Sequence, residues 1–174
     1  SQDMFLSLLE NEYMYPKVTK QMYSPTANKF LPDRYVEGTC PKCGFFPARG
    51  DQCDNCNTLF ESAAELLNPR SKVDDSPLEL RDTEHFFIDL PTIANDGLQA
   101  WLHDGKDYWR PQVINFARNF VDQGLIGRAV TRDMDWGIPV PVAGYEHKVL
   151  YVWFEAVIGY LSAAIEWAKN SGDP

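Results

Sequence analysis

The chain has 174 residues, is 44% hydrophobic and carries a formal net charge of −9. This composition supports a folded core in one domain or two small ones, and the acidic balance excludes an extensive basic surface for nucleic acid. No apolar run reaches the length of a membrane span and no signal-like segment opens the sequence, so we expect a cytoplasmic protein.

The first half of the sequence predicts one helix followed by irregular β structure. Residues 1–15 carry apolar side chains at helical spacing without a start signal, so we expect a helix cut from a longer chain. Prolines punctuate short extended segments over residues 16–89. The last of these, residues 85–90, is expected to be a buried strand.

All four cysteines of the chain lie between residues 40 and 56. They form two C-x-x-C pairs separated by nine residues: Cys40, Cys43, Cys53 and Cys56. This spacing predicts one tetrahedral Zn²⁺ with four thiolate ligands. Two disulfides or a redox-active pair are the alternatives, but neither a signal peptide nor a strand-to-helix pattern accompanies the cysteines.

The residues after each pair favour the same interpretation. Gly44 and Asn57 follow the pairs, where a tight turn needs a positive φ angle that these two residue types tolerate. Four thiolates leave no coordination position for water or substrate, so we expect a structural zinc in a lobe over about residues 38–60. Zinc binding would supply about 10 kcal/mol or more of folding free energy there.

Two amphipathic helices are expected next, at residues 91–103 and 111–123, with Gly124 ending the second. Residues 129–131 read as a short strand. The second helix gathers apolar side chains on one face: Val113, Phe116, Ala117 and Phe120.

The C-terminal segment predicts half of a βαβ unit. Residues 148–154 are almost wholly apolar, which indicates an interior strand of a parallel sheet, and residues 156–169 read as the helix that follows it. Ligands of open α/β sheets bind beyond the carboxyl ends of strands, which places Trp153 and Tyr160 beside one opening. Such a pocket suits a thioether or aliphatic side chain, and ordinary core packing is the alternative.

Five segments, in their order along the chain, resemble methionyl-tRNA synthetases: residues 30–43, 50–56, 84–87, 131–139 and 151–162. The resemblance covers nearly the whole chain. It implies an α/β fold, α+β for the isolated piece, with a β-rich zinc-knuckle connective-peptide lobe, helices and a partial Rossmann-type strand-helix unit. It assigns residues 1–15 to the end of the first catalytic half, 16–147 to the connective peptide and 148–174 to the first strand and helix of the second half.

The family activates methionine with ATP and magnesium and transfers it to tRNA. The family's HIGH and KMSKS motifs are absent from this sequence, so we expect the chain alone to be inactive. Methionine, ATP and tRNA are the partners expected for the parent enzyme. Little tRNA binding is expected from this acidic piece itself, and no membrane association.

The resemblance also assigns individual residues. Trp153, Ala156 and Tyr160 match positions that wall the methionine pocket, and Val157 lies where many members have proline. Arg132 matches a position linked to active-site function in the family.

Three other polar residues are expected to be structural. His85 is not expected to bind zinc, because four thiolates fill the tetrahedron; a hydrogen-bonded core histidine is the expected state. Asp133 and Asp135 are read as turn and cap residues. The Lys and Arg residues are scattered singly along the sequence, which indicates no basic stripe.

Two other functions remain open at this point. One is a free-standing zinc-ribbon interaction module with an acidic surface. The other is the insertion of a related synthetase for leucine, valine or isoleucine, which edits mischarged tRNA, although no Thr-rich, Asp-bearing hydrolytic loop is evident.

Overall fold

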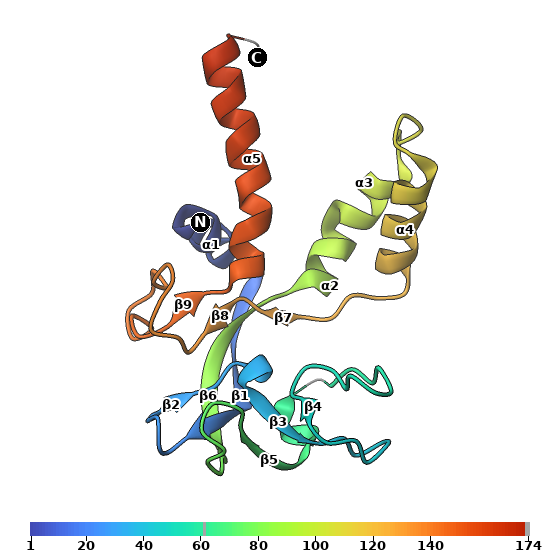
Figure 1. The fold of residues 1–174 in the computed structure, drawn as a ribbon. Helices are drawn as coiled ribbons and strands as arrows, with labels where there is room; N and C mark the ends of the chain where they lie inside the picture. The colour runs from blue at the N-terminus through green and yellow to red at the C-terminus, as the bar shows by residue number, and fades with distance from the viewer. Residues whose placement is uncertain (61, 173–174) are drawn as a thin grey trace. The chain divides into compact units, whose positions relative to one another are not determined.

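The computed structural model describes residues 1–60 and 62–172, which form two compact units (Figure 1). Residues 18–84, here called the cysteine unit, form one of them. The other, here called the helical unit, combines residues 1–17 with the chain from residue 85 onward. No helix in the described part of the chain is long and apolar enough to cross a membrane.

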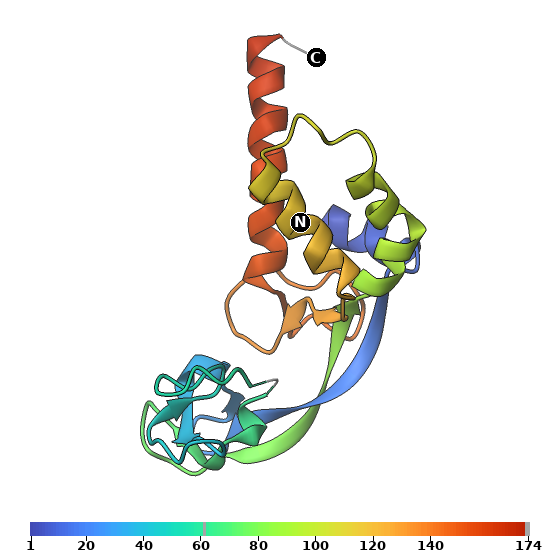
Figure 2. The same ribbon diagram turned by 90° about the vertical axis from the view of Figure 1, so that its right-hand side faces the viewer.

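Two long strands belong partly to each unit. They are β1 (Met14–Ser24) and β6 (Glu79–Ile88), which lie side by side (Figure 1, Figure 2). Their sheet has the order β2-β1-β6-β7, with β2 at Lys29–Phe30 and β7 at Arg128–Ala129. The predicted strand at residues 85–90 is therefore the second half of a longer strand that ends at Ile88.

The cysteine unit is built around a three-stranded antiparallel sheet of order β4-β3-β5. Its strands are β3 (Val36–Thr39), β4 (Ala48–Arg49) and β5 (Leu67–Ser71), and two 3₁₀ turns accompany them, η1 (Asp33–Tyr35) and η2 (Ala63–Glu65). Its buried core is small and includes two cysteines: Met22, Leu31, Val36, Cys40, Ala48, Cys53, Ala63 and Leu66. A unit with so few large apolar side chains is one that a bound metal would stabilise substantially.

Gly50 allows the backbone of the cysteine unit to pack closely. A Cβ atom at this position would lie 2.6 Å from the Ala63 Cβ and 2.7 Å from the Asp33 carbonyl oxygen. Both distances are shorter than van der Waals contact, and one of the two atoms belongs to the backbone. Glycine is therefore required where β4 leads towards the second cysteine pair.

The helical unit contains the predicted helices, but the first ends at Glu10 rather than at residue 15, because β1 begins at Met14. Helix α1 spans Gln2–Glu10 and buries Phe5, whose ring meets that of Phe86 edge-on at 5.3 Å between centroids. The helix predicted at residues 91–103 is present as α2 (Leu90–Ile93), a π-helical turn η3 (Ala94–Leu98) and α3 (Gln99–His103).

Helix α4 spans Pro111–Asp122 and ends before Gly124, whose φ is +92°. It buries Ile114, whereas Val113, Phe116 and Phe120, from the face that looks apolar in the sequence, are exposed in the described chain. The amphipathic pattern thus predicts the helix correctly, and within the described residues its apolar face is largely uncovered.

The expectation of a parallel strand at residues 148–154 is wrong. Only Val149–Leu150 form a strand, β9, and it pairs antiparallel with β8 (Thr131–Arg132). Helix α5 spans Val152–Ser171, so it begins four residues before the predicted start at residue 156. A short apolar run has no periodicity that separates a buried strand from the first turn of a helix, which is the physical reason for the error.

Candidate functional site

The first cysteine pair lies on a tight turn after β3. The Gly44 amide donates to the Cys40 carbonyl oxygen at 2.9 Å, and the Cys40 amide donates to the Phe45 carbonyl oxygen at 2.9 Å. Gly44 has a φ of +71°, as its position after Cys43 predicts. The turn directs the sulfurs of Cys40 and Cys43 towards one point.

The second pair repeats this geometry. The Asn57 amide donates to the Cys53 carbonyl oxygen at 2.9 Å, and the Cys53 amide donates to the Thr58 carbonyl oxygen at 2.9 Å. Asn57 has a φ of +57°, which confirms the expectation for the residue after Cys56. The two pairs are thus equivalent turns that contribute two sulfurs each.

The four sulfur atoms form a compact cluster. All four lie within 4.8 Å of one another, with 3.8 Å from Cys40 to Cys56 and 3.7 Å from Cys43 to Cys53. A zinc ion with four Zn–S bonds of about 2.3 Å requires sulfurs separated by about 3.8 Å. The cysteines are free thiols rather than disulfides, and they are positioned for a tetrahedral metal ion.

Hydrogen bonds favour the thiolate form at two of the four positions. The hydroxyl of Thr58, 3.1 Å from the Cys56 sulfur, is the main cause that lowers the pKa of Cys56 to about 6. The side chain of Asn55, 3.6 Å from the Cys43 sulfur, lowers the pKa of Cys43. Burial raises the pKa of Cys53 to about 11. A bound metal would therefore have to displace the proton of Cys53, whereas Cys56 is readily ionised.

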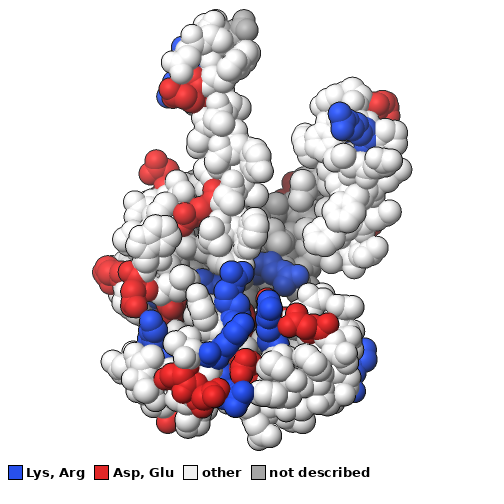
Figure 3. All heavy atoms as spheres, in the orientation of Figure 1, with Lys and Arg blue, Asp and Glu red and all other residues white. Residues whose placement is uncertain are grey.

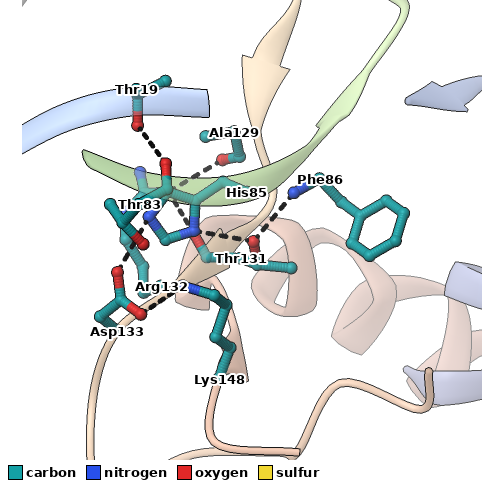
Figure 4. A network of polar contacts seen from close by, with 9 residues as sticks. All are labelled: Thr19, Thr83, His85, Phe86, Ala129, Thr131, Arg132, Asp133 and Lys148. Atoms are coloured by element: carbon teal, nitrogen blue, oxygen red, sulfur yellow. Dashed lines mark hydrogen bonds and ion pairs between the residues drawn. The ribbon is translucent and has the colours of Figure 1, made fainter. Parts of the chain in front are cut away.

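Arg132 lies in β8, within the helical unit. Its guanidinium group donates to the carbonyl oxygens of Ala129 at 3.1 Å and Thr131 at 2.7 Å (Figure 4). The guanidinium carbon also lies over the ring of Tyr151, 3.8 Å from its centroid. Tyr151 is the residue directly before α5. Two backbone carbonyl groups and the Tyr151 ring thus hold the Arg132 side chain in place. The sequence predicts none of these contacts.

Next to Arg132, the structure reveals a buried polar cluster. His85 is fully buried, with Nδ1 3.0 Å from the Thr131 hydroxyl oxygen. Its Nε2 lies 3.2 Å from an Asp133 carboxylate oxygen, at ion-pair distance but outside hydrogen-bonding geometry. The other Asp133 oxygen accepts from the Lys148 ammonium group (Figure 4). His85 is a hydrogen-bonded core histidine, as predicted.

The same cluster corrects the interpretation of Asp133 as a turn or cap residue. Its side chain is only 10% exposed and faces two cationic partners, Lys148 and, when protonated, His85. The sequence contains one signal for this role: Thr131 and Asp133 alternate with Arg132, so they point to the side of the strand opposite Arg132. Lys148 gives no comparable signal, because its partner is fifteen residues away.

The four predicted pocket residues all lie on α5. Trp153, Ala156, Val157 and Tyr160 are spaced i, i+3, i+4 and i+7, which places them on one face of the helix. All four are exposed, with 68% for Trp153 and 82% for Tyr160. Within the described chain, this face of α5 is open to solvent.

The family model and the similar proteins identify one family. The family model for tRNA synthetases class I (M) matches residues 1–174. The methionine–tRNA ligase of Dehalococcoides mccartyi strain 195 is 55% identical over 174 residues, which cover 100% of this chain and 31% of that protein. The methionine–tRNA ligase of Chloroflexus aurantiacus is 52% identical, over 100% of this chain and 29% of its own length.

Solved structures share the fold. Methionyl-tRNA synthetase of Mycobacterium tuberculosis, in its free state, gives a TM-score of 0.52 at 19% identity, over 92% of this chain and 27% of that one. The same enzyme in complex with methionyl-adenylate gives 0.53 at 19% identity, over 92% and 26%. The chain spans less than a third of the relatives that it matches, and it belongs to the class I (M) family of tRNA synthetases.

Proposed function

We propose that the chain is part of a methionine–tRNA ligase, which activates methionine with ATP as methionyl-adenylate and transfers the methionyl group to tRNA. The observation that carries this proposal is the 55% identity to a methionine–tRNA ligase over the whole chain. The parent enzyme would use methionine, ATP with magnesium, and tRNA in the cytoplasm.

Within the parent, we assign residues 1–15 to the end of the first catalytic half and residues 16–147 to the connective peptide. Residues 148–174 would open the second half. These bounds describe the place of each segment in the parent fold, whereas the two compact units describe how this chain packs. The cysteine unit thus accounts for about the first half of the connective peptide.

The metal of the cysteine unit would be zinc with a structural role. Sulfur separations of 3.7 and 3.8 Å suit the Zn–S bond length, and four thiolates leave no open coordination position. Zinc bound to Cys40, Cys43, Cys53 and Cys56 would hold the two turns together in a unit whose own core is small.

The exposed face of α5 would form one wall of the methionine pocket. Trp153 and Tyr160 offer two ring surfaces, and the contact of a thioether sulfur with a ring is worth about 0.3–1.5 kcal/mol. Ala156 and Val157 leave room between the rings for an unbranched side chain. Arg132 is held over Tyr151, the residue before this helix, and would contribute to the active site.

The catalytic groups for ATP would come from parts of the parent outside this chain, because neither HIGH nor KMSKS occurs in the sequence. The decisive experiment replaces the matched 174 residues of the Dehalococcoides mccartyi ligase by this chain and measures methionine-dependent ATP–pyrophosphate exchange and tRNA methionylation. We expect both activities in the chimera and neither in the isolated chain. A folded, zinc-loaded chimera without exchange activity would contradict the proposal.

A further inference from the structure

Arg132 lies between two residues that contact the same buried histidine. Thr131, before it, is fully buried, and its hydroxyl oxygen lies 3.0 Å from His85 Nδ1. Asp133, after it, has a carboxylate oxygen 3.2 Å from His85 Nε2. Figure 4 shows the His85 ring between these two side chains. One side chain of β6 thus contacts both neighbours of Arg132, although 46 residues separate it from Thr131.

The two nitrogens of the His85 ring have partners of different chemistry. The Thr131 hydroxyl oxygen also accepts a hydrogen bond from the Phe86 amide at 3.1 Å, which leaves the hydroxyl proton for His85 Nδ1. A carboxylate can only accept, so the position of Asp133 beside Nε2 favours the tautomer that carries the ring proton there. In this tautomer the ring suits both neighbours of Arg132 at once.

The strand that carries Arg132 is too short to fix its own direction. Strand β8 consists of Thr131 and Arg132 alone, and it pairs only with the two residues of β9. The alternation of an extended chain turns Thr131 and Asp133 to one side and Arg132 to the other. Contacts of His85 with both flanking residues therefore fix the backbone before and after Arg132, and with it the direction in which the arginine side chain leaves.

This direction leads to the start of α5. The guanidinium carbon of Arg132 lies 3.8 Å from the centroid of the Tyr151 ring, and Tyr151 directly precedes the helix. The part of α5 drawn in Figure 3 carries few charged side chains. Those that the helix contains are Glu155, Glu166 and Lys169. Arg132 is thus a cation held beside the first turn of an almost uncharged helix, and its charge acts there only if its side chain is held in place.

We propose that His85 is a positioning residue for Arg132. Its ring holds Thr131 and Asp133, and through them it keeps the Arg132 guanidinium group at the start of α5 for the reaction. The inference rests on the proposed function, in which Arg132 contributes to the active site. It goes further because it gives a fully buried histidine of β6 a part in the reaction without any contact with a substrate.

The first test follows the Arg132 side chain by NMR in the zinc-loaded 174-residue chain. An aromatic ring shifts protons above its face upfield, so the guanidinium protons of Arg132 should resonate upfield of those of exposed arginines. Arg132→Lys assigns the signal by removing it, and Tyr151→Leu should abolish its displacement. His85→Phe keeps a ring but loses both nitrogen contacts, and it should move the signal to the position of exposed arginines.

Two more variants make the NMR result specific. Ile114→Ala is the matched control for a general loss of stability: Ile114 is buried in α4 and is not part of the cluster in Figure 4, so the Arg132 signal should stay in place. Thr131→Val removes the hydroxyl group from the other side of the same hydrogen bond. It should move the signal as His85→Phe does, and it gives the answer if His85→Phe does not fold.

The second test measures methionine-dependent ATP–pyrophosphate exchange in the chimera described above. His85→Phe should lower kcat/KM at least about tenfold, because small displacements of a group at the reacting atoms are costly. His85→Asn places an amide atom where Nδ1 lies and should retain most of the activity. If His85 acts through Arg132, the effects are not independent: in an Arg132→Gln background, His85→Phe should change kcat/KM by less than about twofold.

An unchanged Arg132 signal in His85→Phe or Thr131→Val would overturn the inference. An equal displacement in Ile114→Ala would also overturn it, because it would indicate general loosening. Losses that multiply in the His85→Phe/Arg132→Gln double variant would show that His85 acts independently of Arg132, which again contradicts it. An inactive unmodified chimera would contradict the proposed function instead, and the NMR signal would still decide whether His85 positions Arg132.

Discussion

Lys148 and Asp133 form an ion pair in the interior of the helical unit, between the residue before β9 and the residue after β8. Their side chains are only 5% and 10% exposed. Pairing of this kind is costly to break from one side, because the remaining charge stays buried without its partner. The pair lies at one end of the antiparallel β8–β9 ribbon, where it links the residue after β8 to the residue before β9.

Removal of one partner should therefore destabilise the helical unit. We expect Lys148→Met to lower the free energy of unfolding by about 3 kcal/mol, measured by urea denaturation and tryptophan fluorescence. All five tryptophans lie in the helical unit, so their emission reports on it alone. The double variant Lys148→Met/Asp133→Leu should recover part of the loss. Additive losses in the double-mutant cycle would contradict the coupling.

Loss of the Thr58 hydroxyl should make metal binding more sensitive to pH at Cys56. The thiolate is the ligand, and the hydrogen bond from Thr58 holds the pKa of Cys56 near 6, so protons compete with the metal at this position only below about pH 6. Thr58→Val removes the donor and should raise that pKa. The pH at which half of the zinc is released should then move upward, as followed with a chromogenic zinc indicator.

Thr58→Ser is the control for that experiment, because it keeps a hydroxyl group at the same position. Its release curve should match that of the unmodified chain. If Thr58→Val and Thr58→Ser release zinc at the same pH, the hydroxyl does not stabilise the Cys56 thiolate.

Removal of the metal should affect the cysteine unit first. With a strong chelator, we expect limited proteolysis to cut within residues 18–84 while tryptophan emission stays close to that of the zinc-loaded chain. The reason is that the core of this unit is small and includes two of the cysteines. Added zinc should restore the resistance of residues 18–84 to proteolysis. If the chelator instead changes tryptophan emission at the same time as proteolysis begins, the two units unfold together.

Gly50→Ala should loosen the same unit. The added methyl group meets Ala63 and the Asp33 carbonyl at 2.6 and 2.7 Å, so β4 has to shift. We expect a cost of about 1–3 kcal/mol, seen as a lower temperature of zinc release. Gly159→Ala is the control: beyond the neighbouring backbone of its own helix, no described atom lies within 4 Å of its added Cβ, and alanine favours the helix. Equal release temperatures in both variants would contradict the packing argument.

Local features of the fold could be predicted from the sequence. The cysteine turns depend on residues at most five positions apart, and Gly44 and Asn57 specify their backbone conformation. The end of α4 is equally local, since Gly124 adopts the positive φ that stops the helix. Such signals survive in isolation because the chemistry of a turn does not depend on distant contacts.

Features that depend on distant contacts could not be predicted in the same way. The apolar run after Lys148 reads as a strand, but its length in the structure is set by pairing with β8, and α5 begins at Val152. The burial of Asp133 likewise follows from tertiary packing. Spacing along the chain can suggest which side of a strand a residue faces, but it does not identify a distant partner such as Lys148.

The chain leaves the helical unit along β1 and returns along β6, which are neighbours in one sheet. The cysteine unit is therefore an insertion whose two connections lie next to each other. In protein engineering, such a junction allows an inserted module to be exchanged, shortened or replaced by a simple turn without rerouting the host. The border at residues 17 and 85 is where this chain can be recombined with other modules.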